Sequence, residues 1–327
     1  MAFIRSSTPA KLAYTLHILL LIIFLLYFGQ AVLIPLAFSL FIAVLILPAC
    51  NFFERQGFPR LFACLFCVIL GLLAFVMLAY YLSSQIISFK SDLPAIARNL
   101  TNWLYDLQKY FVKRLHLDPA NVQNFVDTTT NEIIANTSVF VSTTFLTLGR
   151  VIFFVIIIPV YTFLILLYRR LITEFIITSF QTEHHDVVKG IIQKTRCVVK
   201  GYIVGLFIET VIVAVLMCVG FLILGVKYAI LLGIVSALLK LIPYLGIVTA
   251  CLFTMLITLS TNSPATVTGA LIVLLVVHLI DGNFLFPAIV GSKVKMNALA
   301  TIVGVVIGNA LWGIAGMFLA IPLIATL

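Results

Sequence analysis

Long apolar runs follow one another along most of the chain and are separated by short polar turns. Runs near or above the ~20 residues that a helix needs to cross a bilayer recur from Leu12 onward. The run over 61–82 is apolar on every side and does not alternate as barrel strands do. Because backbone groups in lipid must be satisfied within their own segment, these runs are predicted to be helices. The pattern predicts an all-α polytopic membrane protein with about eight membrane segments.

The first region, 1–87, is predicted to hold three membrane helices, over about 12–30, 31–53 and 61–87. Its first apolar run could be mistaken for a signal peptide. It is longer than the apolar region of such a peptide, and no small-residue cleavage site closes it, so we expect a retained helix.

The next two regions combine polar and apolar segments. Region 88–150 is the one extended polar stretch and is predicted to be an extracytoplasmic amphipathic helical segment, with Asp118-Pro119 typical of the start of a second helix. Region 151–200 is predicted to hold a crossing helix over 151–168 and then a basic, cytoplasmic amphipathic stretch.

The last region, 201–327, is predicted to be the transport region. After a crossing helix over 201–224 come two pairs of short apolar halves, and each pair follows a Gly-x-Lys corner. The first pair is interrupted by Pro243 and Gly246. The second pair, over 298–327, is interrupted by three glycines: Gly308, Gly313 and Gly316. Interrupted helices in inverted repeats are typical of transporters, so we predict two re-entrant hairpins in inverted orientation. Tight turns between thin, tilted full crossings are the alternative.

Charge sets the orientation of this scheme. The composition, 63% apolar and 9% charged, excludes a water-soluble domain. With the N-terminus in the cytoplasm, the cytoplasmic loops hold 12 of the 20 basic residues, whereas the five basic residues in 88–149 are balanced by five acids. This distribution follows the positive-inside rule, so the net charge of +9 reports orientation and not nucleic-acid binding.

Three charged residues fall at membrane depth: Glu209, Lys240 and Asp281. Each costs a few kcal/mol at a helix centre, so they are candidate substrate or ion groups by default. Lys240 is also long enough to extend toward the interface, or to neutralise either acid. His278 shares a helix face with Asp281, which suits proton exchange near neutral pH. The alternative is that Asp281-Gly282-Asn283 is a solvated helix end.

Other side chains complete the candidate pathway or carry no chemistry. Tyr244 lies at the first hairpin break, and the amides of Asn283 and Asn309 could bind a polar solute. Cys64-x-x-Cys67 lies within a membrane run without a nearby histidine, so no metal site is predicted. No nucleotide loop, zinc motif or nucleophile elbow is present, which predicts no cofactor, no enzymatic activity and no self-contained ATP-driven pump.

Three motifs carry a resemblance to a known family. They are Leu241-Ile242-Pro243-Tyr244-Leu245-Gly246, then Asp281-Gly282-Asn283 followed by Pro287 and Gly291, and finally Gly313-Ile314-Ala315-Gly316-Met317 with Pro322. In their order and spacing the chain resembles the autoinducer-2 exporter family of PerM-like permeases over nearly its whole length. Lys240 and Asp281 stand where the family often has Asn and Glu. The resemblance implies a bacterial-type inner-membrane permease that forms homo-oligomers.

Together these features predict a secondary transporter that exports a small polar solute, such as a signalling molecule, driven by a gradient of H⁺ or Na⁺. A monovalent cation/proton antiporter is the alternative, with Glu209 and Asp281 as its ion-carrying carboxylates. A membrane scaffold acting through 88–150 is a third possibility. The expected partners are the lipid bilayer, the solute or ion, and further copies of the chain, without nucleic acid.

Overall fold

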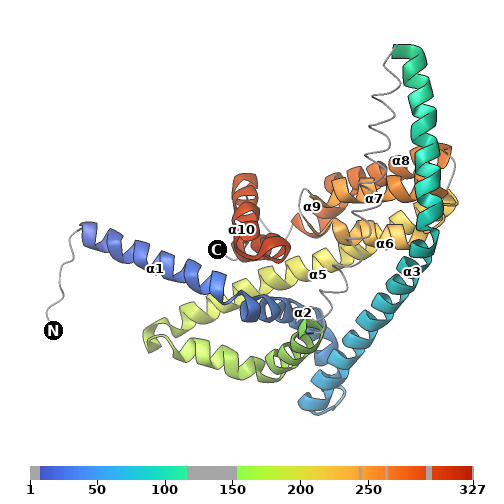
Figure 1. Ribbon diagram of the computed structural model, residues 1–327. Helices are drawn as coiled ribbons and strands as arrows, with labels where there is room; N and C mark the ends of the chain where they lie inside the picture. Colours follow the sequence, from blue (N-terminus) through green and yellow to red (C-terminus); the bar gives the residue numbers. More distant parts are fainter. Residues whose placement is uncertain (1–7, 116–152, 243–244, 262–263, 292–296, 326–327) are drawn as a thin grey trace. The chain divides into compact units, whose positions relative to one another are not determined.

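The computed structural model describes residues 8–115, 153–242, 245–261, 264–291 and 297–325. Within these ranges every element is helical, and Figure 1 traces them in chain order. The first half contains α1 (Thr8–Phe28), α2 (Gln30–Arg55), α3 (Arg60–Leu115), a helix over Phe153–Thr178 and α5 (His185–Ile223). The second half contains α6 (Ala229–Leu239), α7 (Leu245–Thr261), α8 (Pro264–Ile280), a π-helical turn (Asp281–Leu285), α9 (Phe286–Ile289) and α10 (Ala298–Ile324).

The described helices have the length and surface that a bilayer requires. By length and composition alone, six segments could cross it: Gln30–Arg55, Arg60–Ser88, Phe153–Thr178, Thr182–Ile223, Ala265–Ile289 and Leu299–Ile324. The last of them is bent, as described below. Large apolar side chains such as Met77 and Tyr80 are more than 70% exposed, and many others line the outer faces of the helices. Soluble monomers rarely leave such continuous apolar surface in water. The predicted class, a polytopic helical membrane protein, is confirmed.

Some elements run further than their sequence pattern predicted. α3 stays helical from the predicted third membrane segment into the polar region as far as Leu115. The second amphipathic helix, predicted from Asp118-Pro119, lies outside the described residues. α5 joins the basic stretch and the following crossing in one helix of 39 residues. Polarity reports where a helix leaves the apolar layer, but a helix continues until its backbone hydrogen bonding is interrupted.

The chain forms two compact units, and the first contains 1–65, 157–200 and 295–327. Hydrogen bonds and an ion pair join several of its helices. Ser39 Oγ of α2 donates a hydrogen bond to the carbonyl of Ile158 (3.1 Å), and Arg169 Nη2 binds both carboxylate oxygens of Glu54 at 2.7 and 2.9 Å. Trp312 Nε1 of α10 donates to the carbonyl of Leu26 in α1 (2.8 Å).

Within this unit, α10 is not one straight helix. Gly313 has φ +60° and ψ −140°, a conformation that interrupts the helix and favours glycine. On either side of it, Gly308 lies directly against the backbone of Gly316, and Gly304 against the side chain of Ile324. Residues 8 and 20 positions apart could not touch in a straight helix. α10 therefore folds back on itself as a helical hairpin (Figure 1, red).

The second unit contains 66–156 and 201–294. In it α6, α7 and α8 pack in sequence order, and Figure 1 shows them side by side. Their shared core contains four fully buried large side chains: Phe221, Leu232, Ile257 and Leu274. Glycines let α5 pack closely against α6 and α8. An added Cβ on Gly220 of α5 would overlap Val273 of α8, and one on Gly233 of α6 would overlap Cys218 of α5. This packing positions the polar site described next.

Candidate ion and substrate site

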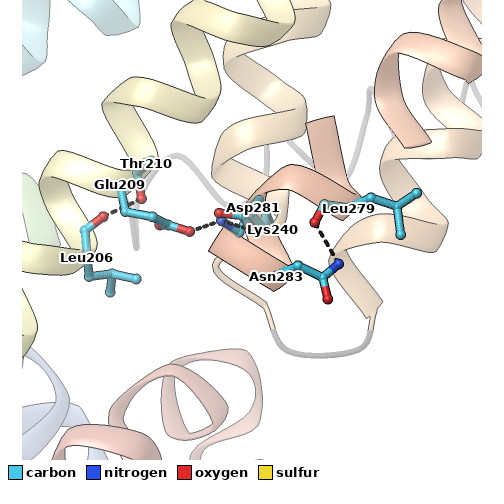
Figure 2. Close-up of polar contacts among 7 residues, drawn as sticks. All are labelled: Leu206, Glu209, Thr210, Lys240, Leu279, Asp281 and Asn283. Carbon is cyan, nitrogen blue, oxygen red and sulfur yellow. Dashed lines mark hydrogen bonds and ion pairs between the residues drawn. The ribbon is translucent and has the colours of Figure 1, made fainter. Parts of the chain in front are cut away.

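Three charged side chains from three separate elements meet in the second unit. Lys240 Nζ binds Glu209 Oε1 and also Asp281 Oδ2, so a single ammonium bridges two carboxylates (Figure 2). Glu209 comes from the middle of α5, Lys240 follows the last residue of α6, and Asp281 opens the π-helical turn after α8. The structure thus brings together the three residues that were predicted from their membrane depth.

Lys240 is held at the tip of the α6–α7 hairpin by backbone contacts. Its N–H donates to the carbonyl of Ser236 (3.1 Å), and the N–H of Gly246 donates to the carbonyl of Ile242 (3.0 Å). A Cβ on Gly246 would overlap the carbonyl of Leu239 and the Cα of Lys240. The end of α6 also carries the negative pole of the helix, which favours a cation there. Glycine at 246 therefore lets the chain turn tightly enough to place the lysine between the two acids.

The site is buried, and its charges do not balance. Glu209 is 0% exposed and Asp281 3% exposed, while the Lys240 side chain is 21% exposed. One ammonium faces two carboxylates, so the ionised cluster carries one net negative charge. In addition, within the part of the chain that the structure describes, Glu209 Oε2 and Asp281 Oδ1 are buried and have no hydrogen-bond partner. Uncompensated charge of this kind is costly in a low-dielectric interior, so the cluster favours one more positive charge.

The predicted break at Asp281 is a π-helical turn and not an end of the helix. The chain stays helical from Pro264 through Ile289, and Asp281 points into the interior at the first position of the wider turn. Asn283 is exposed, and its Nδ2 donates to the carbonyl of Leu279 (2.8 Å), as Figure 2 shows. Short π-helical segments often occur at functional sites. The idea of a fully solvated Asp281-Gly282-Asn283 helix end is therefore wrong for Asp281.

A small cavity of ≈ 20 Å³ lies beside the charged cluster. Its polar lining comes from Ser236, Lys240, His278 and Asp281, and the rest of its wall is apolar. A space of this size holds about one water molecule. His278, predicted to share a face with Asp281, thus lines the same space. Ser236 was not predicted, although it lies in α6 four residues before Lys240, a spacing that puts two helical residues on one face.

The remaining predicted site residues are not part of the cluster that the structure describes. Asn309 is exposed in α10, which belongs to the first unit. Of the three glycines predicted to interrupt this segment, Gly313 alone has non-helical backbone angles, while Gly308 and Gly316 stay helical and form the contact between the two halves. Pro243 and Tyr244 lie outside the described residues. No group of three or more metal-ligating side chains is found in the part of the chain that the structure describes.

Comparison with known proteins identifies the family. The sequence model of the AI-2E family transporter matches residues 16–327. The AI-2 transport protein TqsA of Escherichia coli is 25% identical over 96% of this chain and 89% of its own length. The "Putative transport protein YueF" of Bacillus subtilis is 25% identical over 85% of this chain and 77% of its own length. The chain therefore belongs to the AI-2E transporter family. It is a multi-pass membrane transport protein, and as predicted its family is one of transporters and not of enzymes.

Proposed function

We propose that this transporter exports a small polar solute and that an ion gradient drives the export through Glu209, Lys240 and Asp281. The name of the relative TqsA refers to transport of AI-2, which makes a small polar signalling molecule the first solute to test. The observation that carries the proposal is the buried ammonium bridged by two carboxylates from different helices. Such a cluster is expensive to keep within a membrane segment, and intramembrane charges of this kind mark ion or substrate paths.

The depth of the cluster supports this role. α6 has 11 residues and is therefore about 16 Å long, roughly half of a ~30 Å hydrocarbon core. Lys240 follows its last residue. Counted from the ends of α5 and α8 that we expect to lie outside, Glu209 and Asp281 are roughly 21 and 26 Å along their helices. All three groups then lie within the hydrocarbon core and away from its outer surface.

The two helical hairpins fit the same scheme. The α6–α7 hairpin follows the corner at Lys227, which we place outside, and the α10 hairpin follows a corner that we place inside. If both are re-entrant, they approach the membrane interior from opposite sides, as in transporters with inverted repeats. The orientation with the N-terminus in the cytoplasm of an inner-membrane protein is part of this proposal. Assembly into homo-oligomers is also part of this proposal, and the exposed apolar surface of α1 could contact a further copy of the chain.

Monovalent cation/proton antiport is the second candidate. It is favoured by the net negative charge of the cluster and by Glu209 Oε2 and Asp281 Oδ1, which have no hydrogen-bond partner in the described ranges. In this version the ion is itself the substrate, and the two carboxylates carry it. The scaffold hypothesis depends on 88–150, most of which lies outside the described residues.

Flux through the purified protein in vesicles tests the proposal. Vesicles would be loaded with AI-2 or with Na⁺, and efflux followed with an inward proton gradient, with a sodium gradient and with neither. Gradient-dependent efflux of AI-2 supports the first candidate, and sodium flux that moves protons without any solute supports antiport. Equal efflux rates under all three conditions, or rates equal to those of loaded vesicles without the protein, would contradict ion coupling.

A further inference from the structure

We propose that Lys240 is a tethered cation. Its ammonium occupies a monovalent-cation site formed by Glu209 and Asp281, and a small alkali cation such as Li⁺ or Na⁺ can bind there when the ammonium is absent or withdrawn. This inference rests on the proposed ion coupling and deepens it by naming what the two carboxylates bind. It also assigns the lysine a specific role as an internal competitor of the coupling ion.

The geometry is that of a site built around one cation. Lys240 Nζ binds one oxygen of each carboxylate, and the two acids come from α5 and from the π-helical turn after α8. Both acids are at least nine-tenths buried, and each has a second oxygen that is buried and has no hydrogen-bond partner among the described residues. A bare cation that replaces the ammonium could therefore draw on the four oxygens of the two carboxylates. Hard cations prefer oxygen ligands of this kind.

A monovalent ion matches the charge of the ammonium. With Lys240 in place, the ionised cluster carries a net charge of −1, and without the ammonium it carries −2. One alkali cation restores the charge that the cluster carries when the ammonium is bound. The neighbouring cavity of ≈ 20 Å³, with Ser236 in its wall, adds room for about one water molecule as a further ligand. This space favours a small ion.

Lys240 is also placed so that it can leave. Its side chain is 21% exposed, whereas the two acids that it binds are almost fully covered. Its side chain has four rotatable bonds, so the ammonium can move away from the carboxylates while the backbone stays in place at the hairpin tip. An ion arriving at the carboxylates must displace the ammonium, and the ammonium must return when the ion leaves. Alternation of this kind couples ion binding to the position of the α6–α7 tip, because Lys240 is part of that tip.

The test measures ion binding and does not require transport. Lys240→Gln would be purified in detergent, and its thermal unfolding followed at pH 8.5 in LiCl, NaCl, MgCl₂ and choline chloride at equal ionic strength. We expect Li⁺ or Na⁺ to raise the unfolding midpoint of this variant by about 5 °C relative to choline when the ion is in large excess over its dissociation constant. The unchanged protein should show no such cation-specific rise, because its site is occupied.

Three further variants keep the test decisive. Lys240→Met removes the amide oxygen of glutamine and should respond in the same way as Lys240→Gln. Lys240→Arg keeps a tethered cation and should remain insensitive to alkali ions. Glu209→Gln combined with Lys240→Gln leaves one carboxylate and should lose most of the rise.

Several results would overturn the inference. These are equal midpoints in choline and in alkali salts for both Lys240→Gln and Lys240→Met, a rise of the same size in the unchanged protein, or stabilisation by Mg²⁺ alone. Variants that stay unfolded in every salt would also contradict it, because an external cation could then not replace the ammonium. Failure of the proposed transport function is a separate result: vesicle flux would be absent while the salt-specific rise remained.

Discussion

At the scale of single residues, the three buried ionisable groups depend on one another. Removing one partner from a buried ion pair leaves an uncompensated charge, which typically costs about 3–5 kcal/mol. Here the consequence differs between the residues, because one base faces two acids. Neutralising either acid leaves a balanced pair with Lys240. Neutralising Lys240 leaves two buried carboxylates that repel each other and have no cation between them. Variants of the acids are therefore the ones that separate function from folding.

Asp281→Asn is expected to fold and insert nearly normally but to lose gradient-driven transport. The amide keeps the shape of the side chain, and the ammonium of Lys240 still has Glu209 as a partner. A carrier carboxylate, however, must gain and lose its proton or ion during the cycle, and an amide cannot. The measurement is proton-gradient-driven efflux from vesicles. The efflux rate should fall to that of vesicles without the protein, while exchange without a gradient can survive.

Glu209→Gln is the companion variant and should show the same loss if both acids share one coupling role. Glu54→Gln is a suitable control, because this carboxylate pairs with Arg169 within the first unit and is not a member of the charged cluster. If Asp281→Asn and Glu209→Gln both transported at the original rate and with the original pH dependence, coupling through these acids would be ruled out.

At the scale of elements, the α6–α7 hairpin links packing to the charged site. Gly246→Ala is expected to displace the tip, because the added Cβ would overlap the backbone of Leu239 and Lys240, which cannot simply rotate away. Overpacking of this kind costs about 1–3 kcal/mol. Thermal unfolding in detergent should shift downward, and gradient-driven efflux should fall with it.

The matched control is Gly190→Ala, because a Cβ there meets nothing within 4 Å and the residue lies in α5. Alanine favours a helix more than glycine does, so this variant should be neutral or slightly stabilised. Equal unfolding midpoints and equal efflux rates for Gly246→Ala and Gly190→Ala would show that the close backbone contact at Gly246 is not needed to position Lys240.

The α10 hairpin depends on a different glycine. Gly313→Ala is expected to destabilise the protein by about 1–3 kcal/mol, because φ +60° with ψ −140° is a conformation that alanine adopts only under strain. The readout is again the unfolding midpoint, compared with Gly190→Ala. An unchanged midpoint for Gly313→Ala would mean that α10 can open into a longer helix without cost.

The sequence predicted some of these elements well and others poorly, for identifiable reasons. Proline and glycine between apolar runs placed the ends of α6 and α7 within a few residues. Hydropathy singled out Glu209, Lys240 and Asp281 as charges within apolar runs. It says nothing about which side of a helix faces which neighbour, so the sequence left open whether Lys240 pairs with either acid. A Gly-containing polar turn in an apolar run also looks the same whether it ends a helix or forms a π-helical turn.

The glycines of α10 illustrate a second limit. Glycine serves both as a helix break and as a close-packing surface, and the sequence does not distinguish these uses. Gly313 is a break, whereas Gly308 and Gly316 touch each other across the hairpin. Their spacing of eight residues around Gly313 becomes meaningful only once the chain is known to fold back.

At the scale of the whole molecule, the direction of each hairpin decides how the transporter can work. Two re-entrant hairpins from opposite sides would give the site alternate access, while plain crossings would place the tips in aqueous loops. α6 favours the first arrangement, since 11 residues reach only about 16 Å into the bilayer. α7, with 17 residues, is also shorter than a typical span.

Cysteine labelling in intact cells and inverted vesicles tests this topology. In a background without the six native cysteines, Lys227→Cys should react with a membrane-impermeant reagent only from outside, and Lys189→Cys only from the cytoplasm. Ile242→Cys separates the two arrangements, because it lies at the tip between α6 and α7. If both helices crossed the membrane, position 242 would be a cytoplasmic loop and would label like position 189. In a re-entrant hairpin it lies at the depth of the charged cluster. We then expect slow labelling that changes with the ion gradient, from one side at a time, because the tip carries the lysine that an arriving ion must displace.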